Sequence, residues 1–155
     1  MSPRRVVAFR AGALSGAAPA DQVERVLAVP ALLPAPAAPA WVLGLVTRGG
    51  ETRAVVDVVR RLLGTEPPEP PRHLLWGTWK GIPAALAVTE VEGVLPVEEE
   101  AAAVPEGLPA PLRSYLLGAV RAGGSTRVLL DVDALLGRDA DVLSAAAASE
   151  PSGES

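Results

Sequence analysis

The chain has 155 residues and a formal net charge of −4 at pH 7, which is the size of one ordinary domain or of two very small ones. It contains no Cys and a single His, so the composition excludes a disulfide scaffold, a thiolate metal site, a cysteine nucleophile and any site that needs two imidazoles. Its one Lys does not lie in a phosphate-binding loop motif, and the mildly acidic charge gives no field that attracts nucleic acid. The composition therefore favours a binding protein without cofactor or metal over an enzyme.

The N-terminus does not have the pattern of a secretory signal. Arg4 and Arg5 are followed by an apolar stretch, but Arg10 and Gly12 interrupt it. No run of about eighteen apolar residues occurs in the sequence, so none is long enough to cross a membrane as a helix. We therefore expect a cytoplasmic protein that is not embedded in a membrane.

Short apolar segments separated by Gly and Pro predict a chain built mainly of strands. Strands are expected at residues 5–10, 22–29, 41–47, 52–58, 73–79, 82–89, 91–97, 115–121 and 126–132, with 91–97 continuing the hairpin formed by the two strands before it. Short helices are expected at residues 58–63, 111–116 and 132–136. Pro-rich connectors occupy residues 30–39 and 66–71, and residues 144–155 are expected to be a disordered tail.

The chain carries an internal repeat. Residues 43–58 align with residues 117–132, which lie 74 positions later, and nine of the sixteen pairs are identical. A repeat at about half the chain length predicts two similar halves. The identical pairs include Gly-Gly, a Thr-Arg pair and an Asp, so a chance match in an Ala- and Val-rich chain is the weaker explanation.

Each copy of the repeat has the pattern of a hairpin followed by a short helix. The Gly-Gly pair separates two apolar runs, as tight turns require, because Gly tolerates positive φ. Asp57 and Asp131 end the second strands and are predicted to cap the helices that follow. Gly64 and Gly137 are placed where these helices would end. Many short strands with such turns favour small β-barrels over a sandwich of long strands.

An enzyme on an unrelated all-β fold is an alternative that the residues do not favour. The candidate nucleophiles, acids and bases show no catalytic spacing or motif: Ser15, Ser114, Ser125, Asp57, Asp131 and His73. His73 precedes an apolar run and is predicted to lie at a strand edge. Trp76 and Trp79 are three residues apart in a predicted strand, so we expect one to be buried and the other exposed.

The order of these elements resembles the CheW-like chemotaxis coupling domain. The resemblance extends over residues 5–140 as a single domain, and its pieces lie at residues 7–12, 23–26, 34, 39–44, 55–58, 115–118 and 129–131. The segment from Pro39 through Trp41 and Gly44 to the Val-Val-Asp that ends at Asp57 is the most specific part.

The resemblance implies a mainly β fold of two SH3-like five-stranded β-barrels packed on each other, with short helices. Members of this family are non-catalytic adaptors without cofactors. They bridge the cytoplasmic tips of methyl-accepting chemoreceptors and the regulatory domain of a CheA-type histidine kinase. The resemblance therefore implies a cytoplasmic adaptor that is recruited to receptor clusters.

The sequence departs from the family pattern at positions that the resemblance assigns to partner contacts. Where the family has Asn-Leu-Arg-Gly, this chain has Thr-Arg-Gly-Gly, which puts Gly49 at the position of the family's Arg and Arg48 beside it. The acidic position of the Val-x-Glu-Val element falls on Arg25, with Glu24 beside it. Candidate partner-binding residues at or beside these positions are Glu24, Arg25, Arg48, Gly49 and Glu51.

These departures leave two versions of the adaptor hypothesis open. In the first, the chain couples receptors to the kinase. In the second, it is a divergent accessory member, such as the FrzB type, which binds receptors but has weakened or lost kinase binding, because a changed charge weakens or redirects an interface that depends on charge pairing.

Overall fold

The computed structural model describes residues 4–79, 81–101, 108 and 110–137. Its elements in chain order are β1 (Arg5–Ala11), β2 (Leu14–Pro19), the 3-10 helix η1 (Ala20–Gln22), β3 (Val23–Ala28), β4 (Val42–Arg48), β5 (Glu51–Asp57), α1 (Val58–Leu63), β6 (His73–Trp79), β7 (Ile82–Val88), β8 (Glu90–Pro96), β9 (Glu99–Ala101), α2 (Ala110–Arg113), β10 (Leu116–Ala122), β11 (Ser125–Leu130) and α3 (Val132–Gly137). The predicted tail at residues 144–155 lies outside the described residues.

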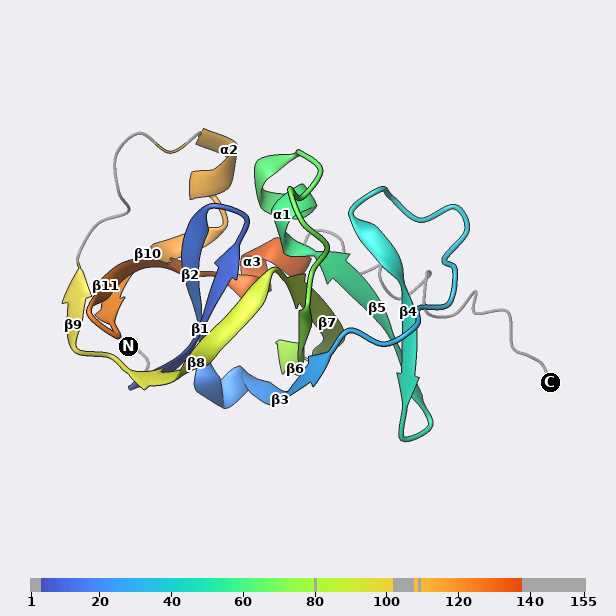
Figure 1. Ribbon diagram of the computed structural model, residues 1–155, viewed down its shortest axis with the longest axis horizontal. Coiled ribbons are helices and arrows are strands. Elements are labelled where there is room, and N and C mark those ends of the chain that lie inside the picture. The colour runs from blue at the N-terminus through green and yellow to red at the C-terminus, as the bar shows by residue number, and fades with distance from the viewer. Residues whose placement is uncertain (1–3, 80, 102–107, 109, 138–155) are drawn as a thin grey trace.

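The strands form two sheets, which lie side by side in Figure 1. One is six-stranded, in the order β8-β1-β2-β11-β10-β9, and the other is five-stranded, in the order β3-β6-β7-β5-β4. The mainly β fold with two SH3-like subdomains and few short helices is thereby confirmed. Over the described residues each sheet is open, and β9, a three-residue strand that the sequence did not predict, adds a sixth member to one of them.

The two sheets are built on the same plan. Strand β5 runs parallel to β7 with Val55 opposite Ala85, and β11 runs parallel to β2 with Leu129 opposite Ala17. Matching these pairs makes β3, β6, β7, β5 and β4 equivalent to β8, β1, β2, β11 and β10. The repeat therefore extends beyond residues 43–58 and 117–132. It also includes Val-Glu-Arg-Val-Leu at residues 23–27 and Val-Glu-Gly-Val-Leu at residues 91–95.

The halves exchange their first hairpins. Hairpin β1–β2, from the first half of the chain, pairs with β8 and β11 of the second, whereas hairpin β6–β7 pairs with β3 and β5 of the first. The prediction that residues 91–97 continue the hairpin before them is therefore wrong, because β8 pairs with β1 and the outer side of β7 is taken by β5. Each sheet thus requires strands from both halves of the chain.

The hydrophobic core is concentrated between the two sheets. A large buried cluster draws Phe9 from the six-stranded sheet, Trp79 from the five-stranded sheet, and Leu62 and Leu135 from helices α1 and α3. Two smaller clusters each belong to one sheet, around Trp76 and around Val120. Because apolar burial contributes about 25 cal/mol per Å², this shared cluster joins the halves more firmly than either smaller cluster could.

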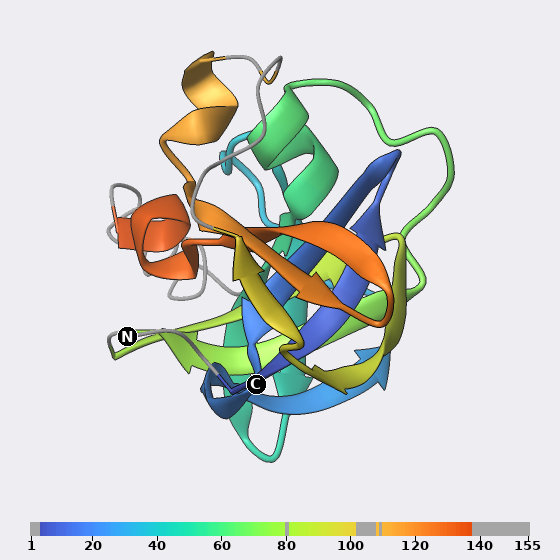
Figure 2. The same ribbon diagram turned by 90° about the vertical axis from the view of Figure 1, so that its left-hand side faces the viewer.

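Equivalent aromatic residues from the two halves meet at the helices. The guanidinium of Arg61 on α1 lies 4.6 Å from the ring centroid of Trp41 and 5.1 Å from that of Tyr115, two positions that are aligned in the repeat. Helices α1 and α2 lie close together on this side of the molecule (Figure 2). Helix α2 is shorter than residues 111–116, because Tyr115 already donates its N–H to Leu112 and β10 begins at Leu116.

The turns and caps of both halves follow the local chemistry of the sequence. The turn glycines all have positive φ, with 61° at Gly49, 79° at Gly50, 63° at Gly123 and 73° at Gly124. The carboxylate of Asp57 accepts the backbone N–H of Val59 at 3.1 Å, and that of Asp131 accepts the N–H of Ala134 at the same distance. The predicted capping roles of both aspartates are therefore confirmed.

The two tryptophans of β6 are both buried, with 4% of Trp76 and none of Trp79 exposed. They belong to different clusters, as alternation along a strand requires. The expectation that one would be exposed is wrong, because the guanidinium of Arg53 covers the ring of Trp76 at 4.2 Å from its centroid. No helix among the described residues is long and apolar enough to span a membrane.

We expect the burial of Asp57, which caps helix α1, to make the stability of the protein depend on pH. Burial raises the pKa of its carboxyl, and the backbone hydrogen bonds from Arg60 and Val59, with the charge of Arg60, only partly oppose this. The folded state therefore binds the proton more tightly than the unfolded state. Stability from this group is present below the ordinary Asp pKa and falls as pH rises through the raised folded pKa.

The test compares Asp57→Asn, which keeps the capping oxygen, with Asp57→Ala, which loses it. Urea unfolding should show the alanine variant less stable by about 1 kcal/mol. The asparagine variant should gain on the wild-type protein as pH rises through the raised pKa of the folded carboxyl, because the wild-type side chain ionises there. A wild-type protein that gains on Asp57→Asn with rising pH would contradict the sign.

Candidate interaction surface

The five predicted partner positions lie at one end of the five-stranded sheet. Arg48, Gly49 and Glu51 belong to the β4–β5 hairpin, which projects at the bottom of Figure 1, while Glu24 and Arg25 lie on β3. All five are exposed. Strands β3 and β4 are the two edges of the sheet, so the sheet order by itself does not bring these residues together.

A buried arginine links the edge strand β3 to β5, the strand next to the other edge. Arg53 on β5 is 5% exposed, and its Nε and Nη2 donate to one carboxylate oxygen of Glu51 at 3.1 and 2.9 Å. Its Nη2 also lies 3.8 Å from a carboxylate oxygen of Glu24 on β3. Nη1 donates to the carbonyl of Gly77 at 2.6 Å. The guanidinium therefore links β5, β6 and β3 at the end of the sheet that carries the predicted surface.

Glu24 is held by a second contact, since it accepts the hydroxyl of Thr78 at 3.0 Å. The side chains of Glu24 and Glu51 remain about half exposed, at 51% and 49%. Both carboxylates are therefore oriented by internal partners while keeping one side toward solvent. We call the set Glu24, Glu51 and Arg53 the Arg53 cluster.

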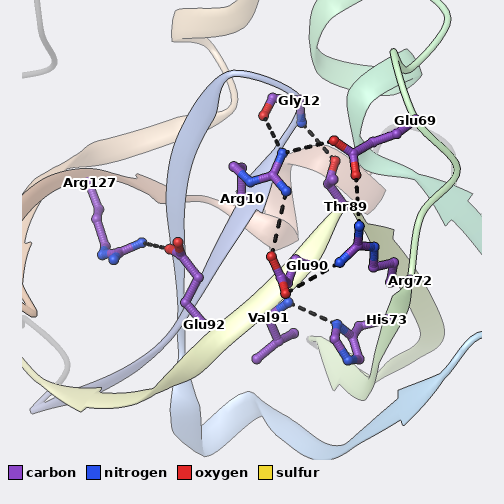
Figure 3. A network of polar contacts seen from close by, with 10 residues as sticks. All are labelled: Arg10, Gly12, Glu69, Arg72, His73, Thr89, Glu90, Val91, Glu92 and Arg127. Carbon is purple, nitrogen blue, oxygen red and sulfur yellow. Dashed lines mark hydrogen bonds and ion pairs between the residues drawn. The ribbon is translucent and has the colours of Figure 1, made fainter.

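The six-stranded sheet contains an equivalent arginine. Arg127 aligns with Arg53 in the repeat, is 6% exposed, and donates from Nη1 to Glu92 at 2.6 Å (Figure 3). Glu92 on β8 is the equivalent of Glu24 on β3. The Thr-Arg pair of the repeat thus contains a buried arginine in each half. The pair is visible in the sequence as a shared feature of the two copies, but the sequence alone did not show its role.

Arg25 and Arg48 differ from the other charged side chains of this surface. Both are exposed, and within the described part of the chain neither side chain forms a hydrogen bond or an ion pair. Arg48 lies opposite Glu51 in the strand register, but the carboxylate of Glu51 is directed to Arg53. The two arginines therefore present unneutralised positive charge to solvent.

A second polar network lies between the halves and serves the fold (Figure 3). Arg10 lies 3.4 Å from Glu69 and 3.6 Å from Glu90, and Arg72 bridges the same two carboxylates at 3.5 and 3.7 Å. These pairs fix the Pro-rich connector against β1 and β8. His73 begins β6, and its Nδ1 accepts the N–H of Val91 at 3.0 Å. It lies at the end of a strand that is paired on both sides, so the strand-edge position predicted for it is wrong.

The described residues contain no group of three His, Asp or Glu side chains that could hold a metal ion. Asp57 and Asp131, two of the catalytic candidates, instead cap helices. These two carboxylates therefore have structural roles at the starts of α1 and α3.

We expect Arg53 and Arg127 to contribute similarly to stability. Replacing either with Met keeps side-chain length but removes the donors to the buried carbonyls of Gly77 or Ala122 and leaves the neighbouring carboxylates without their cation. Each variant should lose about 1–3 kcal/mol in urea unfolding. A loss below about 0.5 kcal/mol in both would mean that these pairs behave as ordinary surface ion pairs.

Comparison with known proteins agrees with the fold. The crystal structure of the scaffolding protein TtCheW from Thermoanaerobacter tengcongensis superposes with a TM-score of 0.71 at 18% identity, over 83% of this chain and 89% of that one. A search of curated proteins finds no match. At this level of identity, the superposition establishes the shared fold.

A family model settles the relationship at the level of sequence. The model of the CheW-like domain matches residues 5–140, which include both sheets, both copies of the repeat and all five predicted partner positions. The chain therefore belongs to the CheW-like domain family.

Proposed function

We propose that this protein is a non-catalytic chemosensory adaptor that couples methyl-accepting chemoreceptors to a CheA-type histidine kinase, working in the cytoplasm at receptor clusters. The observation that carries the proposal is the family match over residues 5–140. The match extends over nearly the whole chain. The solved structure with the same fold is itself described as a scaffolding protein.

The charged end of the five-stranded sheet supports this proposal. It gathers the five residues at or beside the contact positions of the family, and its carboxylates are held in place by Arg53. Oriented charges on a rigid sheet favour specific association, because complementary potentials select partners and steer their encounter. The sheet therefore offers a surface on which one partner of the adaptor can bind.

A second candidate function is an accessory adaptor that binds receptors and engages the kinase weakly. Two observations favour it. Gly49 lies at a positive φ of 61° in the hairpin turn and has no side chain to supply the cation that the family carries at this position. Arg25 is exposed where the family has an acid. These changes alter the surface without altering the backbone.

Binding measurements separate the two functions. The full chain should bind a receptor cytoplasmic-tip fragment and a kinase regulatory domain from its own organism at micromolar concentration, in two separate pull-downs. Binding to both supports the coupling adaptor, and binding to the receptor fragment without the kinase domain supports the accessory adaptor. Binding to neither would falsify the adaptor proposal.

The missing cation can be tested at Gly49. Because φ is positive there, any side chain strains the turn by about 1 kcal/mol, so Gly49→Ala is the control that carries the strain without the charge. If the absent cation weakens kinase binding, Gly49→Arg should bind the kinase domain several-fold more tightly than Gly49→Ala. Equal affinities would show that the position is not the cause.

A further inference from the structure

The two halves of the chain provide an internal comparison for every surface residue. Equivalent positions occupy the same place in equivalent sheets, so a residue that both halves share is accounted for by the fold. A charge that one half carries and the other lacks is not needed to form the strand or turn at that position. This comparison separates the five predicted partner residues into two groups.

Glu24 and Gly49 fall in the group shared by both halves. Glu24 corresponds to Glu92, and each pairs with the buried arginine of its own sheet. Gly49 corresponds to Gly123, and both have a φ near 60° in the same two-glycine turn. Their presence therefore follows from the ion pair and from the turn.

Arg25, Arg48 and Glu51 fall in the other group. Their equivalents are Gly93, Ala122 and Ser125, which form the matching strands and hairpin without any charge. Glu51 is nevertheless occupied inside the molecule, since it accepts two hydrogen bonds from Arg53. Arg25 and Arg48 thus remain as exposed charges that neither the fold nor an ion pair within the described residues uses.

The tip of the second hairpin packs against its own chain, whereas the tip of the first does not. A Cβ placed on Gly123 would lie 2.7 Å from Leu95, so the second hairpin packs its tip against its own chain. A Cβ on Gly49 would meet nothing within 4 Å. Arg121, the exposed cation of the second hairpin, donates to the carbonyl of Gly124 and faces Glu99 in the strand register. The first hairpin presents Arg48 on an uncovered tip.

We propose that Arg25 and Arg48 are the residues of this surface that determine partner specificity, and that they bind carboxylate side chains on an acidic face of the protein partner. The Arg53 cluster neutralises part of the acidic charge beside them, because the guanidinium of Arg53 contacts both Glu24 and Glu51. The ion pair with Arg53 accounts for Glu24, and the two-glycine turn accounts for Gly49. This inference rests on the proposed adaptor function.

The experiment reverses charge at the two positions and at a matched control. The double variant Arg25→Glu/Arg48→Glu is compared with Arg121→Glu, which reverses an exposed strand arginine of the equivalent hairpin. Affinity for the receptor-tip fragment and for the kinase regulatory domain is measured at low and at physiological salt. The unfolding midpoint of each variant is recorded, and Arg25→Gln/Arg48→Gln provides a second variant without added negative charge.

The double reversal should weaken binding to one of the two partners by at least about tenfold, because like charges then face each other. The loss should be largest at low salt, since salt screens the repulsion. Arg121→Glu should stay within about twofold of the wild-type affinity. The glutamine pair should show a smaller loss in the same direction.

Two results would overturn the inference while leaving the adaptor function intact. The first is a folded double variant whose affinity for both partners stays within twofold of the wild-type value. The second is an equal loss of affinity in Arg121→Glu. A wild-type chain that binds neither partner defeats the adaptor function, and the assignment of Arg25 and Arg48 with it.

Discussion

The exchange of the first hairpins is the constraint on which the rest of the structure depends. Each sheet takes two central strands from the opposite half of the chain, and the parallel pairs β5–β7 and β11–β2 join the halves by backbone hydrogen bonds. Neither sheet can form from one half by itself. The large apolar cluster between the sheets then buries Phe9 and Trp79 together, so the two subdomains share one core. If each half had folded by itself, each would have needed a complete hydrophobic core of its own from about half of the chain. Units of that size bury too little apolar surface to be stable easily.

The buried arginines follow from this architecture. An open sheet leaves its edge strands without a hydrogen-bonding neighbour on one side, and β3 and β8 are such edges. Arg53 and Arg127 reach from β5 and β11 to carboxylates on these edges, Glu24 and Glu92. Their cost of burial is offset by several donors used at once, with Arg53 also stacked on Trp76. The same contact fixes the acidic side chains of the candidate surface, so sheet stability and surface geometry share one residue.

Local chemistry made much of the fold predictable from the sequence. The strand at residues 73–79 has the predicted bounds, and the Gly-Gly turns and the caps at Asp57 and Asp131 lie where their residue types require. What failed was non-local. The partner of residues 91–97 is β1, from the opposite end of the chain, and no pattern within that segment specifies it. Trp76 is buried because Arg53 covers it from another strand. The five surface positions were reached through a family pattern, while the Arg53 cluster that orients two of them escaped notice because its members are distant in sequence.

Hairpin exchange holds the two subdomains in a fixed relation, because each contributes strands to the sheet of the other. A motion of one subdomain against the other would have to break strand pairing as well as the shared core, and the ion pairs of Arg10 and Arg72 tie the connector into the same junction. Exposed side chains can then change, and with them the choice of partner, without loss of stability in the two sheets. The second half shows this directly, since Gly93, Ala122 and Ser125 occupy the equivalents of Arg25, Arg48 and Glu51 within an unchanged pattern of strands. The two halves therefore share a strand arrangement, and the charge at one end of the five-stranded sheet is one of the features in which they differ.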